Sequence, residues 1–385
     1  MSRNKFSKEI IKILSINFSI LLVFIFSPAL LYKIYWGFKS RIRLLITPPI
    51  PEDYPVSAHY PTYADKNFSV QLFKEYDKIP YFYRSYIGWR MEKANFEYIN
   101  ISGPYNTRKS TGEALDNSIW FFGGSTMWGT GASDSQTIPS HFNSLTNNKV
   151  YNFGEGSWNS RQSLNQLISA IGDKNNPSAV VFYDGVNDVL NLCRSEVKLL
   201  PAHSMEKRIQ YAVYPKTVPV VPLLKRVSKF IIAPYIALAK KFSVQIPVVS
   251  KSNSNGFDCD TNQEKARSIA HHLVNNWRTA YLLSKSNDFE FYAILQPTLF
   301  TTKTNSEYFL SNHVNENLLF INQYNTVYPL IVKEMQTYCL SDSNFCSSMI
   351  NGTNWLDGTN NIFIDFCHVN SLGNKIIAEH IKSLL

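Results

Sequence analysis

A short apolar run that ends on two glycines sets the strongest constraint on how this chain folds. Residues 118–122 read Ser-Ile-Trp-Phe-Phe, which is typical of a buried strand. Gly123 and Gly124 break the run and place Ser125 where the strand ends. In an open parallel α/β sheet, ligands bind at this carboxyl edge. Ser125 is therefore a candidate nucleophile, although on this stretch alone a serine that only caps the next helix is the simpler interpretation.

From residue 116 onward, predicted strands alternate with predicted helices. The predicted strands are residues 118–122, 149–153, 178–183, 289–295 and 361–366. The predicted helices are residues 138–145, 160–171 and 371–384. This alternation indicates an α/β fold, in which a five-stranded parallel sheet carries helices on both faces.

The N-terminal region contains a candidate membrane anchor. Residues 13–32 carry no charge over a length of about 20 residues, which is what a bilayer core requires. A cleaved signal peptide is the alternative, but the run is longer than a typical signal core and no small-x-small cleavage site follows cleanly. We expect one uncleaved N-terminal transmembrane helix. Basic residues flank it almost equally on both sides, so its orientation stays open.

The expected organisation has three parts. Residues 1–35 form a cytosolic tail and the anchor, residues 36–115 a proline-rich juxtamembrane linker and lead-in, and residues 116–385 the main domain. A lysine-rich insertion, residues 189–261, interrupts the main domain. Within it, the mainly apolar residues 227–244 suit a membrane-interface segment, a lid over the site, or a helix packed on the sheet.

Composition excludes some classes of protein. Apolar residues make up 44% of the chain and charged residues only 17%. The chain can therefore bury a large core, which excludes an intrinsically disordered protein. The net charge of +9 is spread along the sequence without a basic helix or zinc-finger spacing. We therefore expect no nucleic-acid partner, and the charge suits an anionic membrane surface or a polyanionic glycan.

The five cysteines suggest two pairs. Cys339 and Cys346 could close a short loop, and Cys193 with Cys259 would bracket the insertion. Such pairing is typical of an oxidising compartment. Five reduced thiols in a cytosol-facing domain are the alternative. No cysteine spacing resembles a zinc site.

Three residues offer the parts that ester chemistry with a serine needs. His368 can take the proton of Ser125, and Asp365, three residues before His368, can bond the other imidazole nitrogen and hold its tautomer. The predicted strands bring both segments to the same edge of the sheet. We predict Ser125, His368 and Asp365 as catalytic residues.

The same edge also collects hydrogen-bond donors for a developing oxyanion. The candidates are the backbone N–H of Ser125, the N–H of Gly156 or Ser157, and the side-chain amide of Asn187. Each of these features is weak alone, but their order and spacing together are specific.

Together, these motifs resemble those of the SGNH hydrolases, the GDSL-like esterase superfamily. The nucleophile block is residues 123–129, Gly-Gly-Ser-Thr-Met-Trp-Gly, in which Gly124 stands where the name-giving motif has Asp. The Gly-x-Asn-Asp block is intact at residues 185–188, and the Asp-x-x-His block is intact at residues 365–368.

The second block of the family is imperfect in this chain. Residues 152–157 most naturally align Ser157 with the family's oxyanion glycine, and a shift of one residue would use Gly156. The chemistry needs a backbone N–H at this position, which a serine also supplies. The resemblance covers roughly residues 116–385.

The resemblance implies a flavodoxin-like three-layer α/β/α domain without a metal or an organic cofactor. It also implies a membrane-anchored serine esterase that removes acetyl or other acyl groups from a cell-surface glycan. An O-acyltransferase that modifies an envelope polysaccharide with an assembly partner, and a non-catalytic glycan-binding protein, are the alternatives. The catalytic domain is expected on the extracytoplasmic side. Trp128 and Trp158 either stack on a sugar ring or only pack.

Overall fold

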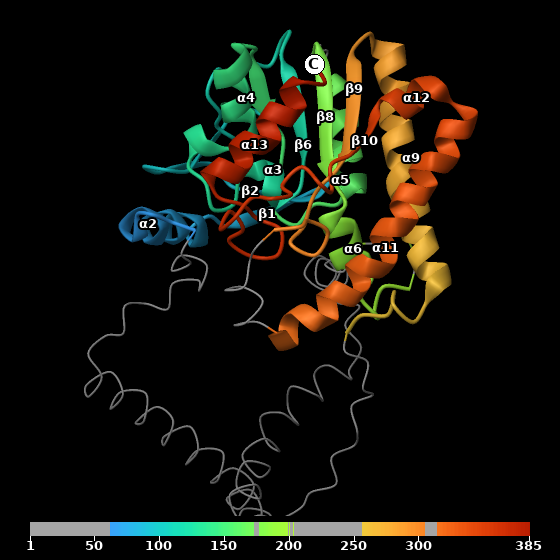
Figure 1. The fold of residues 1–385 in the computed structure, drawn as a ribbon. Coiled ribbons are helices and arrows are strands. Elements are labelled where there is room, and N and C mark those ends of the chain that lie inside the picture. Colours follow the sequence, from blue (N-terminus) through green and yellow to red (C-terminus); the bar gives the residue numbers. More distant parts are fainter. Residues whose placement is uncertain (1–61, 173–176, 199, 201–202, 204–255, 305–313) are drawn as a thin grey trace, which may run out of the picture. The chain divides into compact units, whose positions relative to one another are not determined.

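An eight-stranded sheet forms the centre of the structure, which is a computed structural model (Figure 1). The structure describes residues 62–172, 177–198, 200, 203, 256–304 and 314–385. The sheet order is β10-β9-β8-β6-β7-β5-β4-β3, and β1 and β2 pair as a separate hairpin. The strands are β1 (Tyr81–Arg84), β2 (Gly88–Met91), β3 (Ala94–Asn95), β4 (Asn100–Ser102), β5 (Thr107–Arg108), β6 (Ile119–Gly123), β7 (Val150–Asn152), β8 (Ala179–Asp184), β9 (Glu290–Leu295) and β10 (Met349–Asn351).

Helices connect the strands from β6 to β10, and α2 precedes β1 while α13 follows β10. They are α2 (Lys66–Asp77), α3 (Ser125–Trp128), the 3₁₀ turn η2 (Asp134–Gln136), α4 (Ile138–Thr146), α5 (Ser160–Gly172), α6 (Val186–Leu192), α9 (Gln263–Asn287), α11 (Val314–Ser341), α12 (Ser343–Ser347) and α13 (Ser371–Lys382). The three predicted helices correspond to α4, α5 and α13. The long helices α9 and α11 were not predicted.

The parallel part of the sheet has the flavodoxin-like order. Strands β7, β6, β8, β9 and β10 are parallel neighbours, which is the order 2-1-3-4-5 when they are numbered along the chain. The predicted α/β class is therefore confirmed. Three short antiparallel strands, β5, β4 and β3, continue the sheet on the β7 side. They lie within residues 94–108, so the sheet begins before the expected domain start at residue 116.

The prediction of the fifth parallel strand was wrong. Residues 361–366 form a loop that is closed by a single antiparallel bridge between Phe363 and Val369. The fifth parallel strand is β10, which pairs with β9. The apolar side chains of Ile362 and Phe363 are buried against the sheet from this loop, so their hydrophobicity reflects packing rather than strand pairing.

Two cores on opposite faces of the sheet make the fold three-layered. Along β6, Trp120 and Phe122 join one core, and Ile119 and Phe121 join the other, as the alternation of a strand requires. The first core is completed by α5, α6, α9 and α11, and the second by α4 and α13. Figure 1 shows α4 beside α13, and α9 beside α11.

Both predicted cysteine pairs are disulfides. Cys193–Cys259 joins the two ends of the insertion, and Cys339–Cys346 links the end of α11 to α12. Cys367 is free and buried. Most of the insertion, residues 227–244 included, and the candidate anchor at residues 13–32 lie outside the described residues. Within the described part of the chain, no helix is long and apolar enough to cross a membrane.

The lead-in packs directly on the turn that follows β6. Trp128 of α3 is buried in a cluster of apolar side chains from the lead-in, namely Leu72, Ile79, Met91, Ile99 and Ile101. Strand β6 and helix α3 carry the nucleophile block. Residues before 116 therefore help to position this block, although the family resemblance did not cover them.

Candidate active site

Ser125 begins helix α3 directly after the central strand β6. Gly123 ends the strand with φ +157°, and a Cβ at this position would lie 2.5 Å from the carbonyl oxygen of Tyr183 on β8. Glycine is therefore required where the chain turns from the strand into the helix. As the first helical residue, Ser125 has a backbone N–H without an acceptor inside α3.

The structure brings Ser125, His368 and Asp365 together in one hydrogen-bonded chain. His368 Nε2 lies 2.7 Å from Ser125 Oγ, and His368 Nδ1 lies 2.5 Å from Asp365 Oδ2. Because a carboxylate only accepts, Nδ1 carries the proton that bonds Asp365, and Nε2 is left to accept the hydroxyl proton of Ser125. This is the tautomer that a general base needs.

The loop around Asp365 holds this geometry through its backbone. Asp365 Oδ1 accepts the N–H groups of Cys367 at 2.8 Å and His368 at 2.7 Å. Burial by itself would raise the pKa of Asp365, but the charge of His368 and these hydrogen bonds outweigh burial and lower the pKa. The carboxylate is therefore ionised at neutral pH. A loop, and not the predicted strand, holds it in place.

Asp365, Cys367 and His368 form the one cluster of potential metal ligands in the described part of the chain. Both ring nitrogens of His368 already bond Ser125 and Asp365. Burial raises the pKa of the Cys367 thiol well above its ordinary value, so the thiol stays protonated. The cluster has the geometry of a proton relay rather than of a metal site.

Asn187 lies next to the nucleophile turn, as predicted. It is buried on α6, and its Nδ2 donates to the carbonyl oxygen of Trp158 at 2.8 Å. An amide nitrogen has two hydrogens, so a second one remains for an oxyanion. A Cβ at Gly124 would lie 2.3 Å from this nitrogen. Glycine at position 124, in place of the motif's Asp, thus leaves the space that Asn187 occupies.

We expect Gly124→Ala to lower kcat for an ester by about 10²- to 10³-fold, the value of one oxyanion donor, because the new Cβ displaces Asn187. The backbone itself is not strained by the change, since Gly124 has φ −79°. Gly172→Ala is the matched control, because no atom lies within 4 Å of its new Cβ. Steady-state kinetics check this expectation. A Gly124→Ala enzyme with the parental kcat would contradict it.

Of the two donors proposed in the second block, the N–H of Gly156 is already used. It donates to Glu155 Oε1 at 2.8 Å. Ser157 is exposed and has φ +61°, and its carbonyl oxygen accepts from His203 Nε2 at 3.1 Å. The alignment that places Ser157 at the family's glycine position therefore agrees better with the structure than the shifted alignment with Gly156. A left-handed φ of this kind is the conformation that glycine adopts most readily.

A buried ion pair lies beneath this turn. Arg90 of β2 and Glu155 both have fully buried side chains, and Arg90 Nε lies 3.5 Å from Glu155 Oε2. The same carboxylate oxygen accepts the backbone N–H of Met91 at 3.0 Å. Sequence reasoning missed both residues. A glutamate between two glycines in a buried turn was the available signal, but its partner lies 65 positions earlier in the lead-in.

Trp128 and Trp158 are both almost completely buried, so packing is the correct interpretation of these residues. Arg108 lies over the Trp128 ring at 4.2 Å, and Arg90 lies over the Trp158 ring at 4.8 Å. Neither ring is free to stack on a sugar.

Two buried carboxyl groups support the Gly-x-Asn-Asp block. Asp188 accepts the hydroxyl of Ser160 at 2.5 Å, and Asp184 accepts Trp277 Nε1 at 3.2 Å. Burial raises the pKa of Asp188 to about 6, and burial together with Asp188 raises the pKa of Asp184. Asp184 is therefore structural, as expected of a residue at the end of a strand.

These shifts predict a pH-dependent stability. Because the folded pKa of Asp188 exceeds its ordinary value of 3.8, the native state binds the extra proton, and stability from this group falls as pH rises from about 4 to about 6. Asp188→Asn removes the contribution of this group. Relative to wild type, the variant should gain stability as pH rises from about 4 to about 7, measured by urea unfolding. A stability difference that is constant over this range would contradict the prediction.

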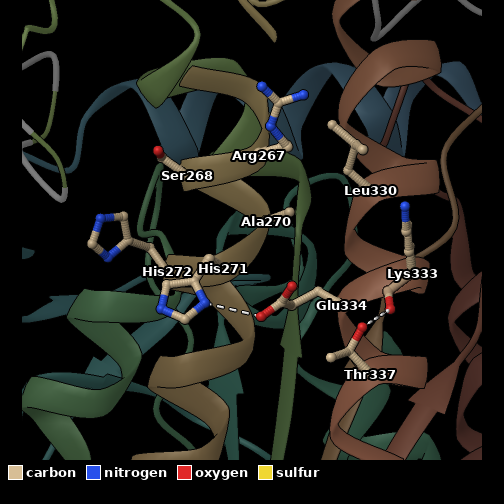
Figure 2. A pocket seen from close by; sticks show the side chains of 9 residues that line it. All are labelled: Arg267, Ser268, Ala270, His271, His272, Leu330, Lys333, Glu334 and Thr337. Atoms are coloured by element: carbon tan, nitrogen blue, oxygen red, sulfur yellow. Dashed lines mark hydrogen bonds and ion pairs between the residues drawn. The ribbon is translucent and has the colours of Figure 1, made fainter. Parts of the chain in front are cut away.

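A separate hollow of about 350 Å³ lies between α9 and α11 (Figure 2). Charged and imidazole side chains line it, and His271 Nδ1 lies 2.9 Å from Glu334 Oε1. None of its lining residues belongs to the candidate active site.

Comparison with known proteins gives distant matches. No family model and no curated protein matches the chain. Among solved structures, it is similar to a protein described as lipolytic and of the G-D-S-L family from Desulfitobacterium hafniense DCB-2. That match has 12% identity and a TM-score of 0.33, over 70% of this chain and 100% of the other.

Two further solved structures are similar to the chain. One is the acetyl xylan esterase AlAXEase, with 13% identity and a TM-score of 0.32, over 70% of this chain and 99% of the other. The second is LAE5, an alpha/beta hydrolase enzyme from the metagenome of Lake Arreo, Spain. It has 12% identity and a TM-score of 0.34, and the match covers 71% of this chain and 97% of the other.

Proposed function

We propose that this protein is a serine-dependent ester hydrolase of the SGNH/GDSL-like type. One observation carries the proposal: Ser125 Oγ, both ring nitrogens of His368 and the carboxylate of Asp365 form a continuous chain of hydrogen bonds. Esters are the substrates that such an arrangement suits, since a serine activated by a neutral imidazole attacks carbonyl carbon.

In the proposed mechanism, Ser125 Oγ attacks the ester carbonyl carbon while its proton passes to His368 Nε2. The negative charge on the carbonyl oxygen is stabilised by the N–H groups of Ser125 and Ser157 and by the amide of Asn187. The ester C–O bond then breaks, and the alcohol leaves with the proton from His368. Water then attacks the acyl carbon and gives a proton to His368 Nε2. The bond between the acyl carbon and Ser125 Oγ breaks, Oγ takes the proton back from His368, and the acid is released.

The proposed substrate is an acyl ester, with acetyl as the first candidate, on a cell-surface glycan. The net charge of +9 supports a polyanionic or membrane-bound target, and the two disulfides support an oxidising, extracytoplasmic location. Anchoring through residues 13–32 is part of the same proposal. It rests on the uncharged run in the sequence alone.

Trapping of the acyl-enzyme tests the function. We expect the full-length protein to release p-nitrophenol from p-nitrophenyl acetate and to carry a transient acetyl group on Ser125, detected by mass spectrometry after an acid quench. Acetylation of any other residue, with turnover intact, would overturn the proposal. Adding free saccharides separates hydrolase from transferase, because a transferase yields acetylated sugar in place of acetate.

A further inference from the structure

The hairpin β1–β2 lines a second hollow, of about 320 Å³, beside the candidate oxyanion turn. Its surface is mainly apolar, and Gly156 and Ser157 of the turn belong to its lining. Four aromatic residues of the hairpin also line it, namely Tyr81, Phe82, Tyr83 and Trp89. We call the three that share one face of the hairpin, Tyr81, Tyr83 and Trp89, the aromatic wall. None of these residues takes part in the bonds between Ser125, His368 and Asp365.

The strand register places the aromatic wall on a single face of the hairpin. Tyr83 pairs with Trp89 and Tyr81 pairs with Met91, so all four side chains point to the same side. Met91, the register partner of Tyr81, is buried. Tyr81 and Tyr83 are 47% and 54% exposed, which leaves an aromatic surface in contact with solvent.

Direct contacts hold the aromatic wall against the turn. Trp89 Nε1 donates to the carbonyl oxygen of Gly156 at 2.9 Å. A Cβ at Gly156 would lie 2.4 Å from the hydroxyl oxygen of Tyr81, so this glycine permits the close approach. The ring of His203, whose Nε2 bonds the carbonyl of Ser157, meets Trp89 edge-on at 4.7 Å between ring centres. Trp89 and His203 therefore hold the aromatic wall in place beside the Gly156–Ser157 turn.

We propose that the aromatic wall is a subsite for the sugar ring whose ester is cleaved, an inference that rests on the proposed function. A pyranose ring has an apolar C–H face, which packs on an aromatic ring, and a rim of hydroxyls, which the Tyr83 hydroxyl can bond. The Tyr81 hydroxyl already bonds Tyr76, so Tyr81 offers its ring. Since Tyr81 and Tyr83 remain about half exposed, the hollow suits this amphipathic partner better than a long acyl chain, which needs enclosure from water.

Binding to the inactive Ser125→Ala protein tests the subsite independently of turnover. Isothermal titration calorimetry would use full-length protein and O-acetylated tetrasaccharides of glucose, xylose, N-acetylglucosamine and mannuronate. We expect at least one of these probes to bind. Adding Tyr83→Ala should weaken that binding about tenfold, whereas Tyr83→Phe, which keeps the ring, should change it less than about threefold.

Tyr86→Asn is the matched control. Tyr86 is a tyrosine of the same hairpin that is 92% exposed, lies outside the hollow and has φ +66°, a conformation that asparagine accepts. It should leave saccharide binding unchanged. Failure of all four saccharides to bind, or a Kd that Tyr83→Ala does not change, overturns the subsite.

A kinetic measurement separates a sugar from an acyl chain as the occupant. If Tyr83→Ala raises the KM for p-nitrophenyl octanoate but does not weaken saccharide binding, the wall holds an acyl chain and the inference is wrong. Tyr83-dependent saccharide binding by a protein that does not turn over any ester would support the subsite while the esterase function fails.

Discussion

Ser125→Ala is expected to lower kcat for p-nitrophenyl acetate by roughly 10⁴- to 10⁶-fold. The variant removes the only atom that forms the acyl bond in the proposed mechanism, and His368 then has no hydroxyl proton to accept. A small residual rate should remain, because the oxyanion donors still polarise the ester carbonyl. Steady-state kinetics on full-length protein, with circular dichroism to establish folding, provide the measurement.

The double variant Ser125→Ala/His368→Ala sharpens this test. Because the two residues act as one unit, the double variant should be about as slow as either single variant, instead of showing the product of the two losses. Gly172→Ala is the control, since no atom lies within 4 Å of its new Cβ and it lies outside the candidate site. Substantial turnover by purified Ser125→Ala protein would refute the mechanism.

Arg90→Met is expected to destabilise the fold by roughly 3–5 kcal/mol, because it leaves a fully buried carboxylate without its counter-charge. Burial raises the pKa of Glu155, and Arg90 and the N–H groups of Met91 and Gly156 act against that rise. Without Arg90 the carboxyl group takes up a proton or the turn rearranges. Urea unfolding at pH 7 measures the loss of stability.

Two further variants identify the cause of that loss. Arg90→Met/Glu155→Gln should be less destabilised than the sum of its single changes, since no charge stays buried alone. Glu334→Gln breaks the exposed pair with His271 and should cost about 1 kcal/mol or less. Equal effects at the buried and the exposed pair would contradict our account. Because Glu155 also bonds the N–H of Gly156, Arg90→Met should lower kcat as well.

Much of the fold was predictable because its signals are local. Four of the five parallel strands and helices α4, α5 and α13 were placed within one or two residues, since the spacing of apolar side chains reports burial directly. Strand β10 was missed because three residues at the sheet edge are too few to show a period. Residues 361–366 were mistaken for a strand because a buried loop has the same apolar composition.

The sequence alone predicted which residues meet at the candidate active-site edge. Two of them, Ser125 and Asn187, follow the ends of recognisable strands. The other two, Asp365 and His368, belong to one motif with a spacing of three residues, so local sequence is enough to identify them. Only the tertiary structure showed which backbone N–H of the turn after β7 is left to act as a donor. Glu155 occupies the N–H of Gly156 and leaves that of Ser157 as the candidate donor.

The tertiary structure also decided the role of the lead-in. Arg90 and the aromatic wall lie about 65 or more positions before the turn that they contact, and no local pattern links the two segments. Spacing along a chain encodes faces of helices and strands, whereas a contact between distant segments depends on how those faces are stacked. The nucleophile edge was therefore visible in the sequence, and the surface beside it was visible only in the folded molecule.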